Sequence, residues 1–280
     1  MCHNGGMATA PSLESPVLLR LLAHGLRWAI VRQLAEGDLR VKELVALTDQ
    51  APNLVTYHLA RLRAAGMVSV RRSAADGRDS YYALDLDAVG DAVQEVALRI
   101  HPGLSGRQMD SATPPPSAEP GRVLFICTGN SSRSQMAEGW LRHLGGPRVV
   151  ARSAGTAPTA LHPLAVTAMK ERGVDISGQD VKHVSVFAGQ PFDRVITLCD
   201  RAREACPEPP PAKVVAHWSI PNPAEAHPAE LDAYRATAAE LRTRVHYLVA
   251  ALGSAGGPAL DGERTVQSDE GEVTLAATRR

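Results

Sequence analysis

The sequence predicts two folded domains of different class, a mainly helical α+β domain followed by an α/β domain with a parallel sheet. Three observations lead to this prediction. The 280 residues are enough for about two domains of ordinary size. Residues 101–121 are rich in Pro, Ser and Gly, a composition that favours an extended, flexible linker. Helical spacings with one hairpin signal precede this stretch, whereas short β-rich runs alternate with helical stretches after it.

Composition narrows the class of protein. Hydrophobic residues make up 44% of the chain and aromatic residues only 4%, so the cores should be mainly aliphatic. Basic and acidic residues number 30 each, so any affinity for nucleic acid needs a local basic patch. No run approaches the roughly 18 apolar residues of a membrane span, and the N-terminus lacks the pattern of a signal peptide. We therefore expect a cytoplasmic protein with no membrane association, in which the four cysteines are not disulfide staples.

The first domain, expected over residues 13–100, begins with one long helix that Gly37 would end. The apolar positions of this helix share one face: Leu18, Leu22, Leu26, Ile30 and Leu34. A short helix over residues 41–50 follows, with Leu44 and Leu47 facing inward. The spacing of the apolar residues thus predicts two helices before Pro52.

A third helix, which Pro52 would begin, completes a helix-turn-helix. Two β-prone arms around Asp76-Gly77 follow at once and predict a hairpin, or wing. This order resembles the winged-helix transcription factors of the ArsR type. The resemblance implies that the helix from Pro52 enters the major groove of a double-stranded DNA operator. It also implies a homodimer, in which residues 85–100 pair with the first helix across a two-fold axis.

Seven side chains are candidate DNA contacts. They are Asn53, Thr56, Tyr57 and Arg61 on the recognition helix, and Arg71, Arg72 and Arg78 on the wing. The alternative is that the arginines form an ordinary solvated face. Cys2 is the only cysteine of this domain and lies in a tail, and the histidines show no metal-ligand spacing. We therefore expect no metal site.

The second domain is expected over residues 122–252 and should contain a four-stranded parallel sheet, because its strands alternate with helices. The expected strands are RVLFIC, PRVVARSAG, FDRVITLC and KVVAHW, at 122–127, 147–155, 192–199 and 213–218. A long helix should run from about 228 to 252. Residues 253–280 are small and polar and are expected to be disordered.

The most informative stretch is CTGNSSR, which follows a buried strand and ends with Arg133 at the start of a helix. Its small residues allow successive backbone N–H groups to point inward as an anion nest, and the helix dipole favours negative charge there. The same field favours the reactive thiolate of Cys127, to which Ser134 could donate a hydrogen bond. The candidate oxyanion-binding residues are Thr128, Gly129, Asn130, Ser131, Ser132 and Arg133. The alternative is a buried cysteine beside an incidental arginine.

In its element order and loop, this domain resembles the low-molecular-weight tyrosine phosphatase fold. Within that fold, CTGNSSRSQMAEGW is more similar to the thioredoxin-coupled arsenate reductases. The resemblance covers about residues 122–250 and includes SAG at 153–155, AMKERGVDIS at 168–177 and VITLCDRAREACP at 195–207. It implies a bifunctional protein, an arsenate reductase fused to a DNA-binding regulator.

The resemblance implies a cascade of three catalytic cysteines, assisted by Arg133 and Ser134. Cys127 attacks arsenate, Cys199 attacks Cys127 to release arsenite, and Cys206 then attacks Cys199. Thioredoxin would reduce the final disulfide, and no bound cofactor is needed. If residues 199–206 were all helical, the terminal Cα atoms would lie roughly 10 Å apart, whereas a disulfide needs less than about 7 Å. The segment must therefore unwind or loop out during turnover.

Asn222 stands where the family that this domain resembles has an aspartate before the proline, which acts there as general acid. An amide cannot donate this proton, and general acid catalysis contributes on the order of 10²–10⁴-fold. We hypothesise that arsenate reduction suffers less than phosphatase chemistry, because arsenate exchanges its oxygens more readily than phosphate does. Two alternatives stay open: a transcriptional regulator whose second domain senses an oxyanion or redox state, and a protein tyrosine phosphatase.

Overall fold

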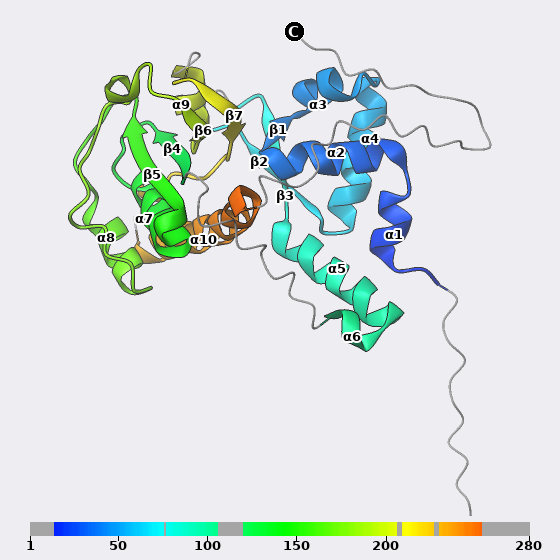
Figure 1. Cartoon of the computed structure of the whole chain (residues 1–280). Coiled ribbons are helices and arrows are strands. Elements are labelled where there is room, and N and C mark those ends of the chain that lie inside the picture. Colours follow the sequence, from blue (N-terminus) through cyan, green and yellow to red (C-terminus); the bar gives the residue numbers. More distant parts are fainter. Residues whose placement is uncertain (1–13, 76, 106–119, 206–208, 227–229, 254–280) are drawn as a thin grey trace, which may run out of the picture.

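The computed structural model describes residues 14–75, 77–105, 120–205, 209–226 and 230–253 (Figure 1). Cys2, Asp76, Cys206, most of the expected linker and the expected tail lie outside these described residues. Within the described part of the chain, no helix is both long enough and apolar enough to cross a membrane.

The N-terminal part forms the expected helix-turn-helix and wing. Its helices are α1 (Val17–Leu22), α2 (Gly25–Glu36), α3 (Val41–Thr48), α4 (Pro52–Ala64), α5 (Leu86–Ile100) and α6 (Pro102–Ser105). Its strands are β1 (Leu39–Arg40), β2 (Val68–Arg72) and β3 (Ser80–Leu84), which form an antiparallel sheet in the order β1-β3-β2. The wing is the β2–β3 hairpin. The core is aliphatic, as the composition predicts: Ile30, Leu34, Leu44, Val55, Leu59, Leu62 and Val68 are buried in one cluster.

Two local predictions for this domain are wrong. The single long first helix is divided, because His24 has extended backbone angles and caps α2, with its ring nitrogen accepting a hydrogen bond from Leu26 N at 3.2 Å. The change in direction turns α1 toward α5 (Figure 1). Leu47 is 54% exposed instead of facing inward. The end of α2 at Gly37 agrees with the prediction.

The C-terminal part contains the expected four-stranded parallel sheet. Its strands are β4 (Gly121–Cys127), β5 (Val149–Gly155), β6 (Phe192–Thr197) and β7 (Ala212–His217), in the order β5-β4-β6-β7. Its helices are α7 (Arg133–Gly145), α8 (Pro163–Lys170), α9 (Asp200–Ala205) and α10 (Leu231–Gly253), with short 3-10 turns η1 (Gly146–Arg148), η2 (Val184–Phe187) and η3 (Pro223–Glu225). All four strands run in one direction, so their carboxyl ends meet at one edge.

The two parts pack directly against each other, with the wing and the corner after α2 facing β7, α9 and α10 (Figure 1). Asp38, at that corner, is buried, and its carboxylate accepts two hydrogen bonds from Arg244 of α10, at 2.8 and 3.1 Å. It also accepts one from Ser219 N at 2.7 Å. Burial works to lower the pKa of Arg244, but the Asp38 carboxylate raises it above its ordinary value. A buried ion pair therefore joins the two parts.

Candidate active site and nucleic-acid interface

The loop between β4 and α7 lies at the carboxyl edge of the sheet. Cys127 ends β4 and is only 2% exposed, and its strand neighbour in the parallel register is Gly155. A Cβ atom at Gly155 would lie 2.6 Å from Thr128 O and 2.9 Å from Asn130 N. Only glycine therefore allows β5 to pass so close to the loop, which explains the SAG motif physically.

Asn130 fixes the shape of the loop. Its backbone is left-handed, with φ of 46°, a conformation that Asn tolerates better than most residues. Its side-chain amide donates to Ser134 Oγ and Ser153 Oγ, both at 2.9 Å. Its side-chain oxygen accepts from Lys182 N at 2.8 Å and from Gln135 Nε2 at 3.2 Å. The side chain is buried and fully bonded, so its role is to hold the loop rather than to contact a ligand.

Ser134 lies against the sulfur of Cys127, with 3.0 Å between Oγ and Sγ. Asn130 donates a hydrogen bond to this hydroxyl oxygen, and when Cys127 is a thiolate the hydroxyl is the donor to the sulfur. A donor in this position stabilises a thiolate. The predicted partnership of Cys127 and Ser134 thus has suitable geometry.

Arg133 begins α7 and is 7% exposed. Its Nη1 donates to the carbonyl oxygen of Ile220 at 3.0 Å, which orients the guanidinium group. Its Nε is buried and has no hydrogen-bond partner. A buried donor without an acceptor costs about 1–3 kcal/mol, and a tetrahedral oxyanion in the loop would supply that acceptor.

Cys199 lies beside the same loop although it is far away in the sequence. It follows β6, is 4% exposed, and its Sγ is 3.3 Å from Thr128 Oγ1. The structure thus brings Cys199 next to the residue that follows Cys127. Among the described residues, no group of three or more His, Cys, Asp or Glu side chains is arranged to hold a metal ion.

Asn222 precedes Pro223 and caps the turn η3. Its side-chain oxygen accepts a hydrogen bond from Ala224 N at 3.4 Å. The position therefore carries a capping amide and no acidic proton.

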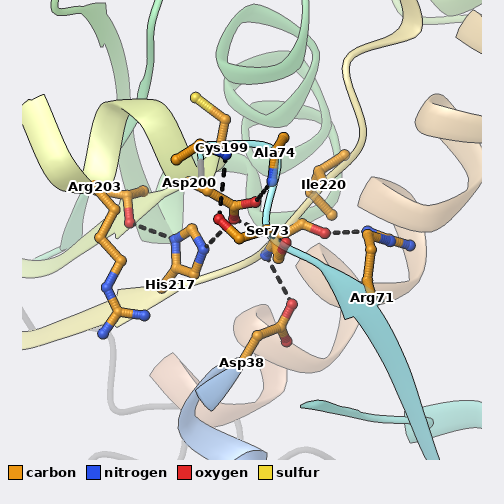
Figure 2. Close-up of polar contacts among 12 residues, drawn as sticks. Asp38, Arg71, Ser73, Ala74, Cys199, Asp200, Arg203, His217 and Ile220 are labelled. Atoms are coloured by element: carbon orange, nitrogen blue, oxygen red, sulfur yellow. Dashed lines mark hydrogen bonds and ion pairs between the residues drawn. The ribbon is translucent and has the colours of Figure 1, made fainter. Parts of the chain in front are cut away.

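A buried polar network next to Cys199 is not evident from the sequence (Figure 2). Asp200 accepts hydrogen bonds from His217 Nε2 at 2.9 Å and from Ser219 Oγ at 2.8 Å. His217 Nδ1 in turn lies 2.8 Å from Thr197 Oγ1. In the sequence, this network is indicated only by the position of Asp200 directly after Cys199, and that position does not reveal the partners of Asp200.

The candidate DNA-binding residues divide into two groups. Asn53, Thr56, Tyr57 and Arg61 are exposed on α4, and Arg72 and Arg78 are exposed on the wing. Arg71 instead faces the C-terminal domain: its Nη1 donates to Ser219 O, and its Nη2 is 3.5 Å from Glu240 Oε1. In this arrangement the Arg71 guanidinium contacts the C-terminal domain.

A parallel sheet whose first strand ends in a Cys-x5-Arg anion loop defines a phosphatase-like oxyanion site. Residues 122–256 match the family described as low molecular weight phosphotyrosine protein phosphatase, and residues 24–70 match the bacterial regulatory proteins of the arsR family. An arsenate reductase of Bacillus subtilis is 44% identical over 108 residues, which are 39% of this chain and 78% of the relative. The glutaredoxin arsenate reductase of Synechocystis is 33% identical over 131 residues, 47% of this chain and 98% of the relative.

The chain belongs to the arsenate reductases of the low molecular weight phosphatase family, with an arsR-family helix-turn-helix domain fused at the N-terminal side. Among solved structures, an arsenate reductase in the oxidised state is 33% identical, covers 47% of this chain and 98% of its own, and has a TM-score of 0.43.

Proposed function

We propose that this protein reduces arsenate to arsenite through its cysteines and binds operator DNA through its N-terminal domain. The main support is that three features lie together: a buried cysteine beside a hydroxyl group, an arginine with an unpaired buried N–H, and a second cysteine beside the same loop. A phosphatase needs only the first cysteine. A second thiol beside the loop suits a reaction that consumes electrons.

The proposed reaction has three thiol steps. The Cys127 thiolate attacks arsenic and a protonated oxygen leaves as water, while Arg133 and the loop N–H groups bind the remaining oxygens. The Cys199 thiolate then attacks the Cys127 sulfur, and the electron pair of the broken S–As bond stays on arsenic as arsenite departs. Cys206 attacks Cys199, which restores the Cys127 thiolate and leaves a Cys199–Cys206 disulfide.

The first test is NADPH consumption by the purified protein with arsenate, thioredoxin and thioredoxin reductase. We expect turnover that is abolished by Cys127→Ser and retained by Cys2→Ser, a matched cysteine substitution in the N-terminal tail. Cys199→Ser should also abolish turnover, whereas a phosphatase would keep its activity. Turnover that survives Cys127→Ser would contradict the proposed function.

The reductant is a separate question, because the relatives include a glutaredoxin arsenate reductase. We propose thioredoxin, because the paired resolving cysteines confine the oxidation to one internal disulfide. Replacing thioredoxin by glutaredoxin and glutathione in the same assay should reduce the rate at least tenfold. A higher rate with glutaredoxin would overturn this choice.

The DNA-binding unit is proposed to be a homodimer built on α1 and α5, the outer helices of residues 13–100. Both helices carry exposed apolar side chains, among them Leu19, Val93, Leu98 and Ile100. Val93→Asp should convert the dimer to a monomer in analytical ultracentrifugation and weaken DNA binding. Val186→Asp, at an equally exposed valine of the C-terminal domain, is the control. An unchanged mass for Val93→Asp would exclude this interface.

A further inference from the structure

The connection after β7, residues 218–220, is bonded both to the oxyanion loop and to the N-terminal domain. Ile220 O accepts the hydrogen bond from Arg133 Nη1 that orients the guanidinium group, at 3.0 Å. The preceding residue, Ser219, is 3% exposed, and its backbone is bonded to two residues of the N-terminal domain. The carbonyl that orients Arg133 therefore lies one residue away from the contact between the domains.

Asp38 and Arg71 are the two residues that bind this backbone (Figure 2). Ser219 N donates to Asp38 Oδ2 at 2.7 Å, and Arg71 Nη1 donates to Ser219 O. A buried backbone N–H or C=O group that lacks a partner is costly. Both backbone groups of Ser219 thus have a partner that only the N-terminal domain supplies.

The C-terminal domain fixes the same connection at other atoms. Residues 218–220 belong to no helix or strand, so no regular ladder holds them. Trp218 N donates to Thr197 O at 2.8 Å, and Ser219 Oγ donates to Asp200 at 2.8 Å. The peptide plane between Ser219 and Ile220 is rigid, and Arg71 holds its carbonyl oxygen. Arg71 therefore helps to fix the direction in which the chain continues to Ile220 O.

The corner that carries Asp38 is itself firmly placed against β7. Asp38 N donates to His217 O at 2.7 Å, and a Cβ atom at Gly37 would lie 2.9 Å from the same oxygen. Arg244 of α10 holds the Asp38 carboxylate with two hydrogen bonds. A carboxylate fixed in this way is a precise acceptor for Ser219 N.

We propose that Asp38 and Arg71 are positioning residues of the oxyanion site. They act through Ser219 and Ile220 on Arg133, and neither touches the ligand. When either residue is lost, the connection shifts, Ile220 O no longer orients the guanidinium group, and the oxyanion binds more weakly. The N-terminal domain is thus part of the support of the oxyanion site. The inference rests on the proposed function for the chemical class of the ligand.

The test measures the affinity of the full-length protein for inorganic phosphate, an oxyanion that needs no reduction. Phosphate is titrated against alkylation of Cys127 by iodoacetamide, which is followed by mass spectrometry of the Cys127 peptide. Arg71→Ala and Asp38→Ala should each raise the phosphate Kd roughly tenfold, because a misplacement of about 1 Å can cost up to 10²-fold. A Kd that both variants leave unchanged would overturn the proposal.

Conservative variants separate positioning from general loosening of the fold. Arg71→Lys should restore most of the affinity, because an ammonium group can donate to Ser219 O. Asp38→Asn keeps an acceptor for Ser219 N and should cost less than Asp38→Ala, so it also serves if Asp38→Ala does not fold. In an Arg133→Lys background, Arg71→Ala should add little further loss, because both changes act on one contact. Fully additive losses would reject the route through Arg133.

Two matched controls should leave the phosphate Kd within about twofold of wild type, as uncoupled sites do. Arg72→Ala removes the neighbouring, exposed arginine of the wing. Tyr247→Phe removes a different hydrogen bond between the domains, from the phenol group to Leu86 O at 3.1 Å. If Tyr247→Phe weakened phosphate as much as Arg71→Ala does, domain docking in general and not the bonds to Ser219 would be responsible, which would refute the proposal.

The same preparations are assayed for arsenate turnover with thioredoxin. If phosphate protects Cys127 in the wild type but arsenate is not reduced, the reductase function fails, while the comparison of Arg71 and Asp38 variants still decides the inference. If phosphate does not protect Cys127 in the wild type, the oxyanion site is absent and both proposals fail.

Discussion

At the scale of single residues, the site is organised by hydrogen-bond direction. Asn130 donates a hydrogen bond from its side chain to Ser134 Oγ, and this hydroxyl is the donor to Cys127 Sγ when the cysteine is a thiolate. Arg133 is oriented by Ile220 O and retains an unpaired Nε for a ligand. Ser134 and Arg133 are therefore each held by one hydrogen bond within the protein and keep a second contact for the sulfur or the ligand. The loop is thus arranged before any oxyanion binds.

Asn222 allows a test at this scale. Asn222→Asp places a carboxylic acid before Pro223, where a leaving oxygen needs a proton, and should raise p-nitrophenyl phosphate hydrolysis by roughly 10²–10⁴-fold. Arsenate reduction should rise much less, because arsenate exchanges its oxygens more easily. Equal gains in both assays would show that proton donation limits both reactions. Asn222→Ala is the control and should raise neither rate.

At the scale of elements, the close approach of β5 to the loop after β4 makes a prediction. Gly155→Ala should push the loop away, because its new Cβ would lie 2.6 Å from Thr128 O. We expect a lower melting temperature and at least a tenfold weaker protection of Cys127 by arsenate against alkylation. Gly178→Ala, where no atom lies within 4 Å of the added Cβ, should leave both unchanged. Undiminished protection in Gly155→Ala would show that the loop tolerates displacement.

Helix α9 joins the region of Cys199 to the N-terminal domain. It is only six residues long, follows directly after Cys199, and carries both Asp200 and Arg203. Short helices are marginal in isolation and depend on tertiary contacts. Its contacts with the N-terminal domain therefore contribute to its stability as well as to domain docking.

At the scale of the whole molecule, buried charges join the two domains. Asp38 of the N-terminal domain pairs with Arg244 of α10, and Asp200 of α9 accepts a hydrogen bond from Ala74 N of the wing. A buried carboxylate that loses its partners is costly. Because these groups are paired across the domains, we expect the domains to unfold in one transition. Two separate calorimetric transitions would contradict this view.

Asp200 makes this contact sensitive to acid in a defined direction. Its folded pKa lies below the ordinary aspartate value of 3.8, so its stabilising effect is present above pH 3.8 and is lost as the pH falls through the lower folded value. The stability difference between wild type and Asp200→Asn, measured by urea unfolding, should be constant from about pH 5 to 7 and shrink below pH 3.8. A difference that grows toward acid pH would contradict this assignment.

Local sequence patterns were enough to predict the two domain classes, the wing, the four parallel strands and the Cys127 loop. These features depend on local spacing and turn chemistry, as at Gly37, Gly155 and the run from Cys127 to Arg133. Three features became visible only in the folded chain: α1 ends before His24, Cys199 lies beside Thr128, and Arg71 faces the C-terminal domain. Arg71 and Ser219 are 148 residues apart, and such a contact has no local pattern. Burial and long-range pairing, which depend on the complete fold, determine it.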